Sequence, residues 1–233
     1  MRLAVIIPIG PDHIEQAEQA AASVWNAWRT NSGPFRHLVV IRKRDLGKGR
    51  SETRNRGMDQ AMELGADWLF LLDADDRMTP HAMSCIDLES PATFGAIMLN
   101  GQVALGDRWP VSRETLFAHG ADGTLAMGCF VRADLGVRFD ESLENGEDFD
   151  FYMRLPGFMK RPDPLVDIAY HAPAAHHKNS MARRKADWQN VCWQVVRGYA
   201  VREGRDDPGP TRPRSHKTRG RVSTSLLQAH RGK

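Results

Sequence analysis

The stretch Trp68-Leu69-Phe70-Leu71-Leu72-Asp73-Ala74-Asp75-Asp76 decides the fold of this chain. Five apolar residues run directly into three carboxylates within four positions. The apolar run predicts a buried strand near the centre of a sheet. Because an unpaired buried charge is costly, the carboxylates must emerge at the C-terminal end of the strand, the edge where open α/β sheets bind ligands. Asp73 and Asp75 would face one side of extended backbone and share a hard cation; a solvated acidic turn, with Asp76 capping the next helix, is the alternative.

Strands and helices alternate along the chain before this stretch. Short apolar runs predict strands, and helical spacing of apolar residues predicts helices. The strands are expected at 3–7, 37–41 and 66–73, and the helices at 13–29 and 51–63. This order implies a parallel, doubly wound α/β sheet with right-handed crossovers. Asp12 and Ser51 are the expected N-caps of the two helices, and Trp25 and Trp28 are expected in the core.

The chain after Asp76 is less regular. Thr79-Pro80 predicts a helix that continues to Leu88, with Pro in its first turn. Shorter strand-like pieces follow at 94–99, 102–105, 109–117, 125–131 and 165–170, which is typical of a partly antiparallel half. Two further helices are expected at 148–155 and 181–202. The first of them begins within a run that holds six acidic residues in thirteen, and acidic residues favour a helix N-terminus.

Composition and charge are those of a soluble protein. Three cysteines without a C-x-x-C pair (Cys85, Cys129 and Cys192) favour reduced, mostly buried thiols over a disulfide framework or a zinc site. No apolar segment reaches the roughly 18–20 residues that cross a bilayer, and the N-terminus does not resemble a secretory signal, so a cytoplasmic location is expected. Residues 202–233 carry nine Lys or Arg against three acids. They predict a basic, flexible tail that is solvated or contacts an anionic surface or nucleic acid.

Four blocks, in order over residues 3–181, resemble the family 2 glycosyltransferases with the GT-A fold. The first strand ends in Ile6-Ile7-Pro8, and Arg54-Asn55-Arg56-Gly57 followed by Phe70-Leu71-Leu72-Asp73-Ala74-Asp75-Asp76 is similar to the ARN-G … FLD-x-DD block. Phe139-Asp140-Glu141 … Gly146-Glu147-Asp148-Phe149-Asp150-Phe151 is similar to the FDE … GED-x-DF block, and His177-Lys178-Asn179-Ser180 to the RHPNS segment. The resemblance implies a Rossmann-like mixed sheet with a parallel N-terminal half.

The resemblance also implies an activity. A sugar would move from a nucleotide-diphosphate donor, expected to be a UDP-sugar, to an acceptor hydroxyl with inversion. Asp148 is implied as the base that takes the acceptor's proton, with Glu147 orienting the acceptor or a loop. Asp75 and Asp73 are implied as ligands of Mn²⁺ or Mg²⁺, which stabilises charge on a leaving diphosphate. A purely structural N-capping role for Asp148 remains the alternative.

Further contacts are implied at three positions. Pro8 and Arg54 are implied as contacts of the nucleotide donor, and an ion pair between Arg54 and the acidic edge is the alternative. A neutral imidazole from His177, or from its neighbour His176, is a further candidate metal ligand.

One departure from the family pattern follows the second strand. The family carries an acidic residue there that contacts the nucleotide base, whereas this chain has Arg42-Lys43-Arg44-Asp45. Either Asp45 substitutes for that acid or the base is held differently. The acceptor is not defined by the sequence and is expected to be a glycan, a nucleic acid or another polymer.

The expected organisation is a glycosyltransferase domain at 1–180, with a nucleotide-sugar half at about 1–100 and an acceptor half at about 101–180, then a helix at 181–203 and a basic tail at 204–233. One rival is a nucleotidyltransferase, which would need a basic, Gly-rich loop after the first strand; Ile9-Gly10-Pro11-Asp12 lacks the basic residues. The other rival is a catalytically silent module that binds sugar nucleotides or nucleic acid. Intact Asp75 and Asp148 count against it.

Overall fold

A computed structural model describes residues 1–99, 101–103, 127–168 and 185–205. The strands are β1 (Arg2–Ile9), β2 (His37–Arg44), β3 (Trp68–Leu71), β4 (Arg77–Met78), β5 (Ala92–Leu99), β6 (Gln102–Val103), β7 (Cys129–Arg132) and β8 (Met159–Ile168). The α-helices are α1 (Ile14–Thr30), α2 (Arg50–Glu63), α4 (Glu147–Arg154) and α5 (Lys185–Arg202), and η1 (Ala82–Cys85) and η3 (Ala133–Leu135) are short 3₁₀ helices. The strand expected at 109–117 and the tail from residue 206 lie outside the described residues.

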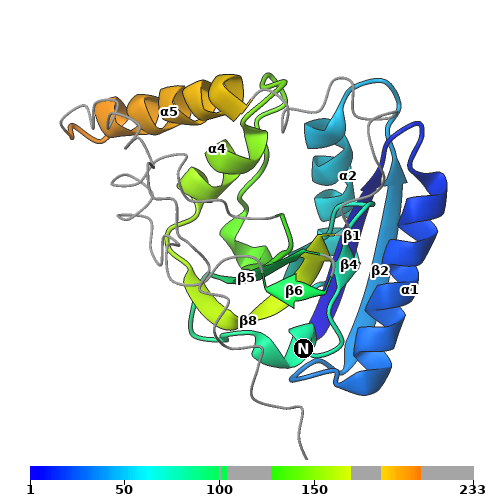
Figure 1. Ribbon diagram of the computed structural model, residues 1–233. Coiled ribbons are helices and arrows are strands. Elements are labelled where there is room, and N and C mark those ends of the chain that lie inside the picture. Colours follow the sequence, from blue (N-terminus) through cyan, green and yellow to red (C-terminus); the bar gives the residue numbers. More distant parts are fainter. Residues whose placement is uncertain (100, 104–126, 169–184, 206–233) are drawn as a thin grey trace, which may run out of the picture.

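The strands form one mixed sheet in the order β2-β1-β3-β7-β5-β8-β4, with β6 paired to β5 (Figure 1). β1 pairs in parallel with both β2 and β3. β7 is antiparallel to β3 and β5, and β5 and β8 are parallel. A parallel N-terminal half and a mixed remainder confirm the fold class expected from the sequence.

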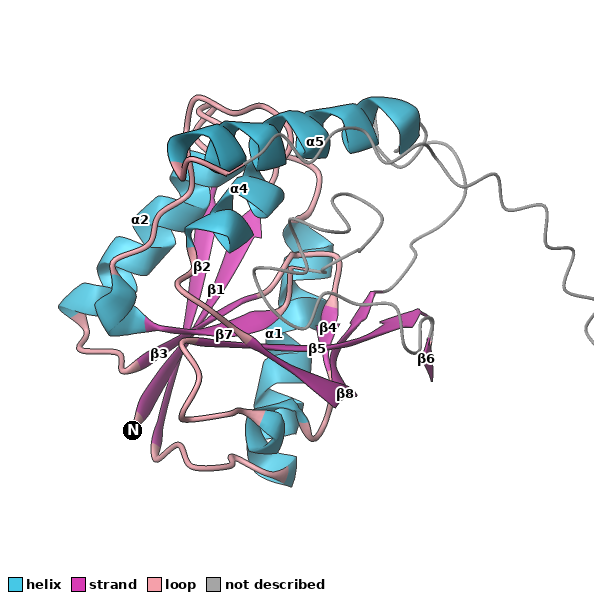
Figure 2. Ribbon diagram, turned by 90° about the vertical axis from the view of Figure 1, so that its left-hand side faces the viewer, coloured by secondary structure: helices cyan, strands magenta, loops and turns pink. Residues whose placement is uncertain are grey.

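Alternating side chains of the central strands divide the core into two layers. Leu3, Val5 and Ile7 of β1 pack with the buried face of α1, and Ala4 and Ile6 pack on the opposite face with Met58 and Ala61 of α2. Aromatic residues of α4 and buried residues of α5 extend this second layer. Figure 1 shows α1 and α2 on opposite sides of β1 and β2, and Figure 2 shows α5 lying over α4. Both faces of the central strands are therefore covered, as their continuous apolar runs require.

The helix expected from Thr79 to Leu88 is wrong, because only the short η1 forms there. The chain is held to β8 instead: Thr79 N–H donates to Leu165 O at 3.0 Å, and its hydroxyl donates to Pro164 O at 2.6 Å. These two bonds hold the start of the segment against β8. The local helix propensity of this segment is outweighed by the hydrogen bonding of Thr79 to Pro164, 85 positions away.

Three local expectations in the first two helices are also wrong. α1 begins after His13 and α2 after Gly49, and neither N-terminus has a side-chain cap from Asp12 or Ser51. Trp25 is 42% exposed, whereas Trp28 packs against the core as expected. Helical spacing identifies one buried stripe, and Trp25 lies at its margin on the solvent side.

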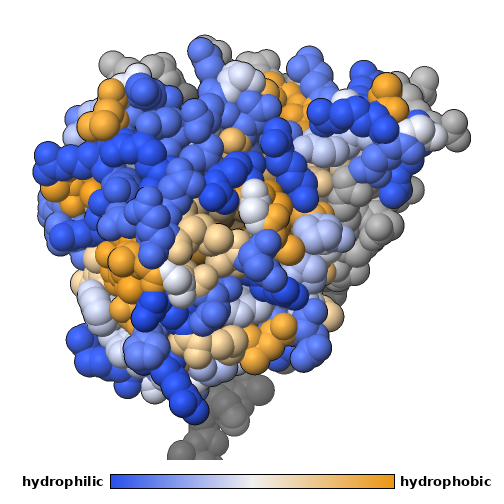
Figure 3. Space-filling model, turned by 180° about the vertical axis from the view of Figure 1, so that it is seen from behind, coloured by the Kyte–Doolittle hydropathy of each residue, from blue (hydrophilic) through white to orange (hydrophobic). Residues whose placement is uncertain are grey.

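Three further features concern membrane spans, cysteines and the surface. Within the described residues, none of the helices has the length and apolar character of a membrane span. Cys129 is a buried free thiol and Cys85 is a partly buried one, as the cysteine pattern predicted for these two. Figure 3 shows a largely hydrophilic rear face on which apolar side chains form small, separated patches.

Candidate active site

Arg54 is the centre of the candidate site. It lies in α2 and is 2% exposed, although it carries a full charge. Its Nη2 lies 2.7 Å from Asp73 Oδ1, and its Nη1 lies 3.1 Å from Asp148 Oδ1 and 3.3 Å from Glu147 Oε1. Burial lowers the pKa of this guanidinium, but the three carboxylates outweigh that effect and hold the pKa above its usual value. Arg54 therefore stays charged and joins the two acidic blocks of the sequence.

Asp73 reaches Arg54 because of the alternation along β3. Leu69 and Leu71 face the layer that contains α2 and α4, and Asp73 comes two residues later. Its carboxylate thus emerges at the C-terminal end of the strand on the side of α2. The side chain is 32% exposed, so it also faces the ligand edge. The ion pair between Arg54 and the acidic edge is present, and the expected contact of Arg54 with a nucleotide stays a prediction.

A turn replaces extended backbone directly after Leu72. Asp76 N–H donates to Asp73 O at 3.1 Å, which closes the turn over Asp73–Asp76. Asp73 and Asp75 are therefore arranged by a turn and not by a strand. Asp76 is 6% exposed, and burial raises its pKa to about 9, with Asp73 and Asp75 adding to the rise.

Asp148 and Glu147 open α4 and have different environments. Glu147 is 2% exposed and bonds Arg50 Nε at 2.6 Å as well as Arg54. The Asp148 side chain is 38% exposed, which leaves one side of its carboxylate accessible. Burial raises the pKa of Asp148 to about 7; Arg54 opposes the rise, and Glu147 and Asp73 add to it. Water on the exposed side moderates this effect. A carboxylate that is both accessible and more basic than usual is suited to accept a proton near neutral pH.

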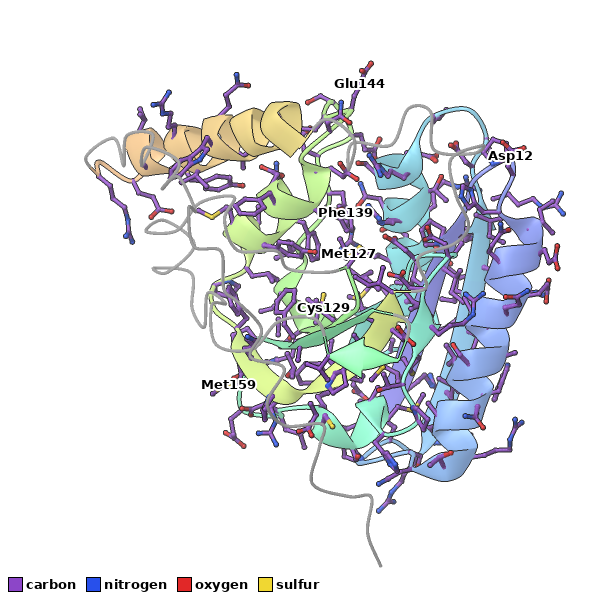
Figure 4. The ribbon with its side chains drawn as sticks, in the orientation of Figure 1. Asp12, Met127, Cys129, Phe139, Glu144 and Met159 are labelled. Atoms are coloured by element: carbon purple, nitrogen blue, oxygen red, sulfur yellow. The ribbon has the colours of Figure 1, made fainter. Side chains whose placement is uncertain are left out.

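Asn55 fixes the loop that leads to α4. Its Oδ1 accepts from Phe139 N–H at 3.0 Å, and its Nδ2 donates to Phe139 O at 3.1 Å and to Glu141 Oε1 at 2.8 Å. The Phe139 ring lies 5.0 Å from Arg54 Cζ and stacks on Phe151 of α4 at 4.3 Å. Figure 4 shows Phe139 in the interior between α2 and α4. The Arg54-Asn55 pair thus positions the second acidic block, a role that the sequence analysis did not identify.

Asp45 is used by the loop between β2 and α2. Its Oδ1 accepts from the backbone N–H groups of Gly47, Lys48 and Gly49 at 2.9–3.1 Å. The cation Arg42 pairs with Glu18 of α1. Asp45 therefore has a structural role in this loop.

The remaining predicted residues fall into three groups. Pro8 lies near the end of β1, in register with Lys43 of β2, at the ligand edge. Asp150 pairs with Arg154 at 2.6 Å and accepts from Tyr199 Oη of α5 at 3.0 Å, so its contacts are structural. His176 and His177 lie outside the described residues. Figure 4 shows Asp12, after β1, and Glu144, before α4, at the same end of the molecule.

The carboxylate oxygens at the end of β3 fit a divalent cation. The described residues contain no cluster of three His, Cys, Asp or Glu arranged as a metal site. However, Mg²⁺ in nucleotide sites is usually held by one or two carboxylates together with phosphate oxygens and water. Asp75 and Asp73 provide such oxygen ligands, and a cation beside Asp76 would offset the repulsion from Asp73 and Asp75, which adds to the effect of burial on the Asp76 pKa. The chemistry of these residues therefore fits Mg²⁺ or Mn²⁺.

Comparison with solved structures identifies the fold. No family model matches the chain, and no curated protein sequence matches it. The S. aureus TarS 1–349 complex with UDP-GlcNAc is 14% identical and covers 87% of this chain and 72% of its own, with a TM-score of 0.57. The catalytic domain of Drosophila β1,4-galactosyltransferase 7 with xylobiose is 11% identical over 76% of this chain and 73% of its own, with a TM-score of 0.53.

A mutant of the Drosophila enzyme in complex with manganese, UDP-Gal and xylobiose gives a TM-score of 0.51 at 10% identity, over 78% of this chain and 79% of its own. At these identities the likeness concerns the fold. The chain has a GT-A-like glycosyltransferase fold. The resemblance found in the sequence blocks is confirmed at that level.

Proposed function

We propose that this protein transfers a glycosyl group from a nucleotide-diphosphate sugar to an acceptor hydroxyl, with inversion. The observation that carries the proposal is the contact of one buried arginine, Arg54, with both Asp73 and Asp148. It brings an acidic edge suited to a donor within reach of an accessible carboxylate suited to act as a base. The GT-A-like fold supports the same function, since structures that share it include complexes with UDP-GlcNAc and UDP-Gal.

The proposed chemistry divides between the two acidic blocks. Asp148 takes the proton of the acceptor hydroxyl as the oxygen attacks the anomeric carbon, and the bond to the diphosphate breaks on the opposite face. Asp75 and Asp73 would hold Mg²⁺ or Mn²⁺, which when bound stabilises the charge of the leaving diphosphate. Glu147, paired with Arg50 and Arg54, keeps the start of α4 in place. Pro8 and the end of β2 would line the nucleotide.

Donor binding is tested by thermal unfolding with nucleoside diphosphates and their sugars, with and without Mn²⁺. A ligand at 100 times its dissociation constant adds about 2.7 kcal/mol of stability, so a clear rise in Tm is expected for the true donor, with UDP-sugars expected to give the largest. Asp75→Asn should remove the part that depends on Mn²⁺. If no nucleotide raises the Tm with or without the metal, the donor-binding proposal fails.

Catalysis is tested separately by Asp148→Asn. This variant should keep the metal-dependent rise in Tm and lose transfer to acceptors and hydrolysis of the donor. The anomeric configuration of the product, read by NMR, tests inversion. A catalytically silent sugar-nucleotide-binding module is the second candidate, because Asp148 is already engaged by Arg54. Donor binding without turnover by the wild type, over a panel of glycan and polymeric acceptors, would favour that module.

A further inference from the structure

Tyr152 of α4 carries a polar group that the proposed mechanism does not use. The residue is 1% exposed, and within the described part of the chain its hydroxyl has no hydrogen-bond partner. A buried hydroxyl left unpaired costs about 1–3 kcal/mol. Phenylalanine would fill the same space without that cost, so the retained oxygen requires an explanation.

The ring of Tyr152 is packed in the core between α4 and the sheet. It packs edge-on against Phe94 of β5, with ring centroids 5.1 Å apart and an interplanar angle of 88°. Phe94 is paired in register with Cys129 of β7, which in turn is paired with Leu71 of β3, two residues before Asp73. Tyr152 therefore lies over the same part of the sheet from which the acidic edge emerges.

Tyr152 and Asp148 lie on the same face of α4, one turn apart. Tyr152 follows Asp148 by four positions, and long side chains in a helix lean back toward the preceding turn. The carboxylate of Asp148 can accept another bond: among the described residues its hydrogen bond and its ion pair are both with Arg54, through Oδ1. Burial raises the pKa of the Tyr152 hydroxyl well above its usual value, and the Asp148 charge adds to the rise. The hydroxyl stays protonated and is available as a donor.

We propose that Tyr152 is a positioning residue for the base: its hydroxyl donates a hydrogen bond to the Asp148 carboxylate when that side chain turns from Arg54 toward the acceptor. The inference rests on the proposed role of Asp148 as the base. A hydrogen bond to a carboxylate favours the ionised form. Tyr152 thereby keeps Asp148 oriented and charged once the ion pair with Arg54 is loosened. The other charged or titratable groups around Asp148 are Arg50, Arg54, Asp73, Cys129 and Glu147.

The test is Tyr152→Phe, which removes one oxygen and keeps the ring. Two effects are expected, one on stability and one on the Asp148 pKa. The Tm should stay equal or rise, because an unpaired buried hydroxyl is lost. The Asp148 pKa, read from its carboxyl ¹³C shift with donor and diamagnetic Mg²⁺ present, should rise by about one unit, which corresponds to about a tenfold loss of kcat at pH values below it. The KM for the donor should not change.

The matched control is Tyr199→Phe. The Tyr199 hydroxyl donates to Asp150 Oδ1 at 3.0 Å between α5 and α4, so the same atom is removed from a structural contact. This variant should lower the Tm and leave the Asp148 titration unchanged. A rise in Tm for Tyr152→Phe with the Asp148 pKa and kcat unchanged within twofold would overturn the inference.

The titration also separates this inference from the proposed function. The ¹³C measurement needs no turnover. If the Asp148 pKa differs between the wild type and Tyr152→Phe but the wild type shows no transfer, Tyr152 is a partner of Asp148 and the proposed glycosyl transfer is contradicted. An active wild type with no shift in Tyr152→Phe supports transfer and overturns the positioning role.

Discussion

Arg54 Nη1 lies 3.1 Å from Asp148 Oδ1, although the two residues are 94 positions apart. The other terminal nitrogen of the same guanidinium lies 2.7 Å from Asp73 Oδ1. One buried side chain therefore fixes the spacing between the end of the central strand and the start of α4. A displacement of either acidic block is opposed by the loss of a charge-assisted hydrogen bond to this buried guanidinium.

Arg54→Met should strongly destabilise the protein. The substitution keeps an apolar stem of similar length but leaves buried Glu147, and partly buried Asp73 and Asp148, without this cation. Removing one partner of a buried ion pair costs about 3–5 kcal/mol, and urea unfolding at pH 7 measures the loss. Arg138→Met is the matched control, since its pair with Asp59 is largely exposed and should contribute less than about 1 kcal/mol. Equal losses for the two variants would contradict the central role of Arg54.

Asn55→Ala should show that the loop before α4 depends on one side chain. The variant leaves the N–H and C=O of Phe139 without partners among the described residues, and an unpaired buried group costs about 1–3 kcal/mol. A loss of about 2–4 kcal/mol in the free energy of unfolding is expected. Asn31→Ala removes one exposed hydrogen bond to Gly33 N–H and should cost much less. Faster hydrogen exchange at Phe139 N–H in Asn55→Ala would locate the effect.

These contacts mark the limit of what the sequence allowed us to predict. The parallel half of the sheet and the position of Asp73 at its edge follow from short apolar runs and from the cost of burying carboxylates, which are local properties. The pairing of Asn55 with Phe139 joins positions 84 residues apart, and no local pattern specifies it. The failed helix after Thr79 has a similar cause, because the N–H and the hydroxyl of Thr79 bond Leu165 O and Pro164 O of β8. Tyr152 gave no signal, since a tyrosine on a buried helix face is indistinguishable from a core aromatic residue.

Gly128→Ala should destabilise the sheet where β7 begins. Gly128 has φ +141°, a conformation that other residues rarely adopt, and a Cβ there would lie 2.5 Å from Val166 Cγ1. Overpacking of this kind typically costs about 1–3 kcal/mol, and the backbone strain adds to it. Adding Val166→Ala to Gly128→Ala should relieve the close contact with the Val166 side chain and leave the backbone strain in place. Gly198→Ala in α5 is the opposite case: among the described residues, and apart from its chain neighbours and the backbone of its own helix, no atom lies within 4 Å of the added Cβ. It should raise the free energy of unfolding by about 0.5–1 kcal/mol.

Activity and stability should respond to pH in opposite directions through Asp148. Because the native pKa is raised to about 7 and an unfolded Asp has a pKa of about 3.9, the native state binds more protons between these values. Stability from this group is therefore greatest below about pH 4 and falls as the pH rises through about 7. Transfer needs the deprotonated base, so kcat/KM should rise as the pH rises through about 7.

Asp148→Asn removes both effects. The variant should be inactive, and its stability relative to the wild type should increase as the pH rises from 4 to 8. Asp76 also titrates with a raised pKa, so the difference between the two proteins, measured by urea unfolding at each pH, isolates Asp148. A difference that does not change with pH would contradict the raised pKa and, with it, the poised base.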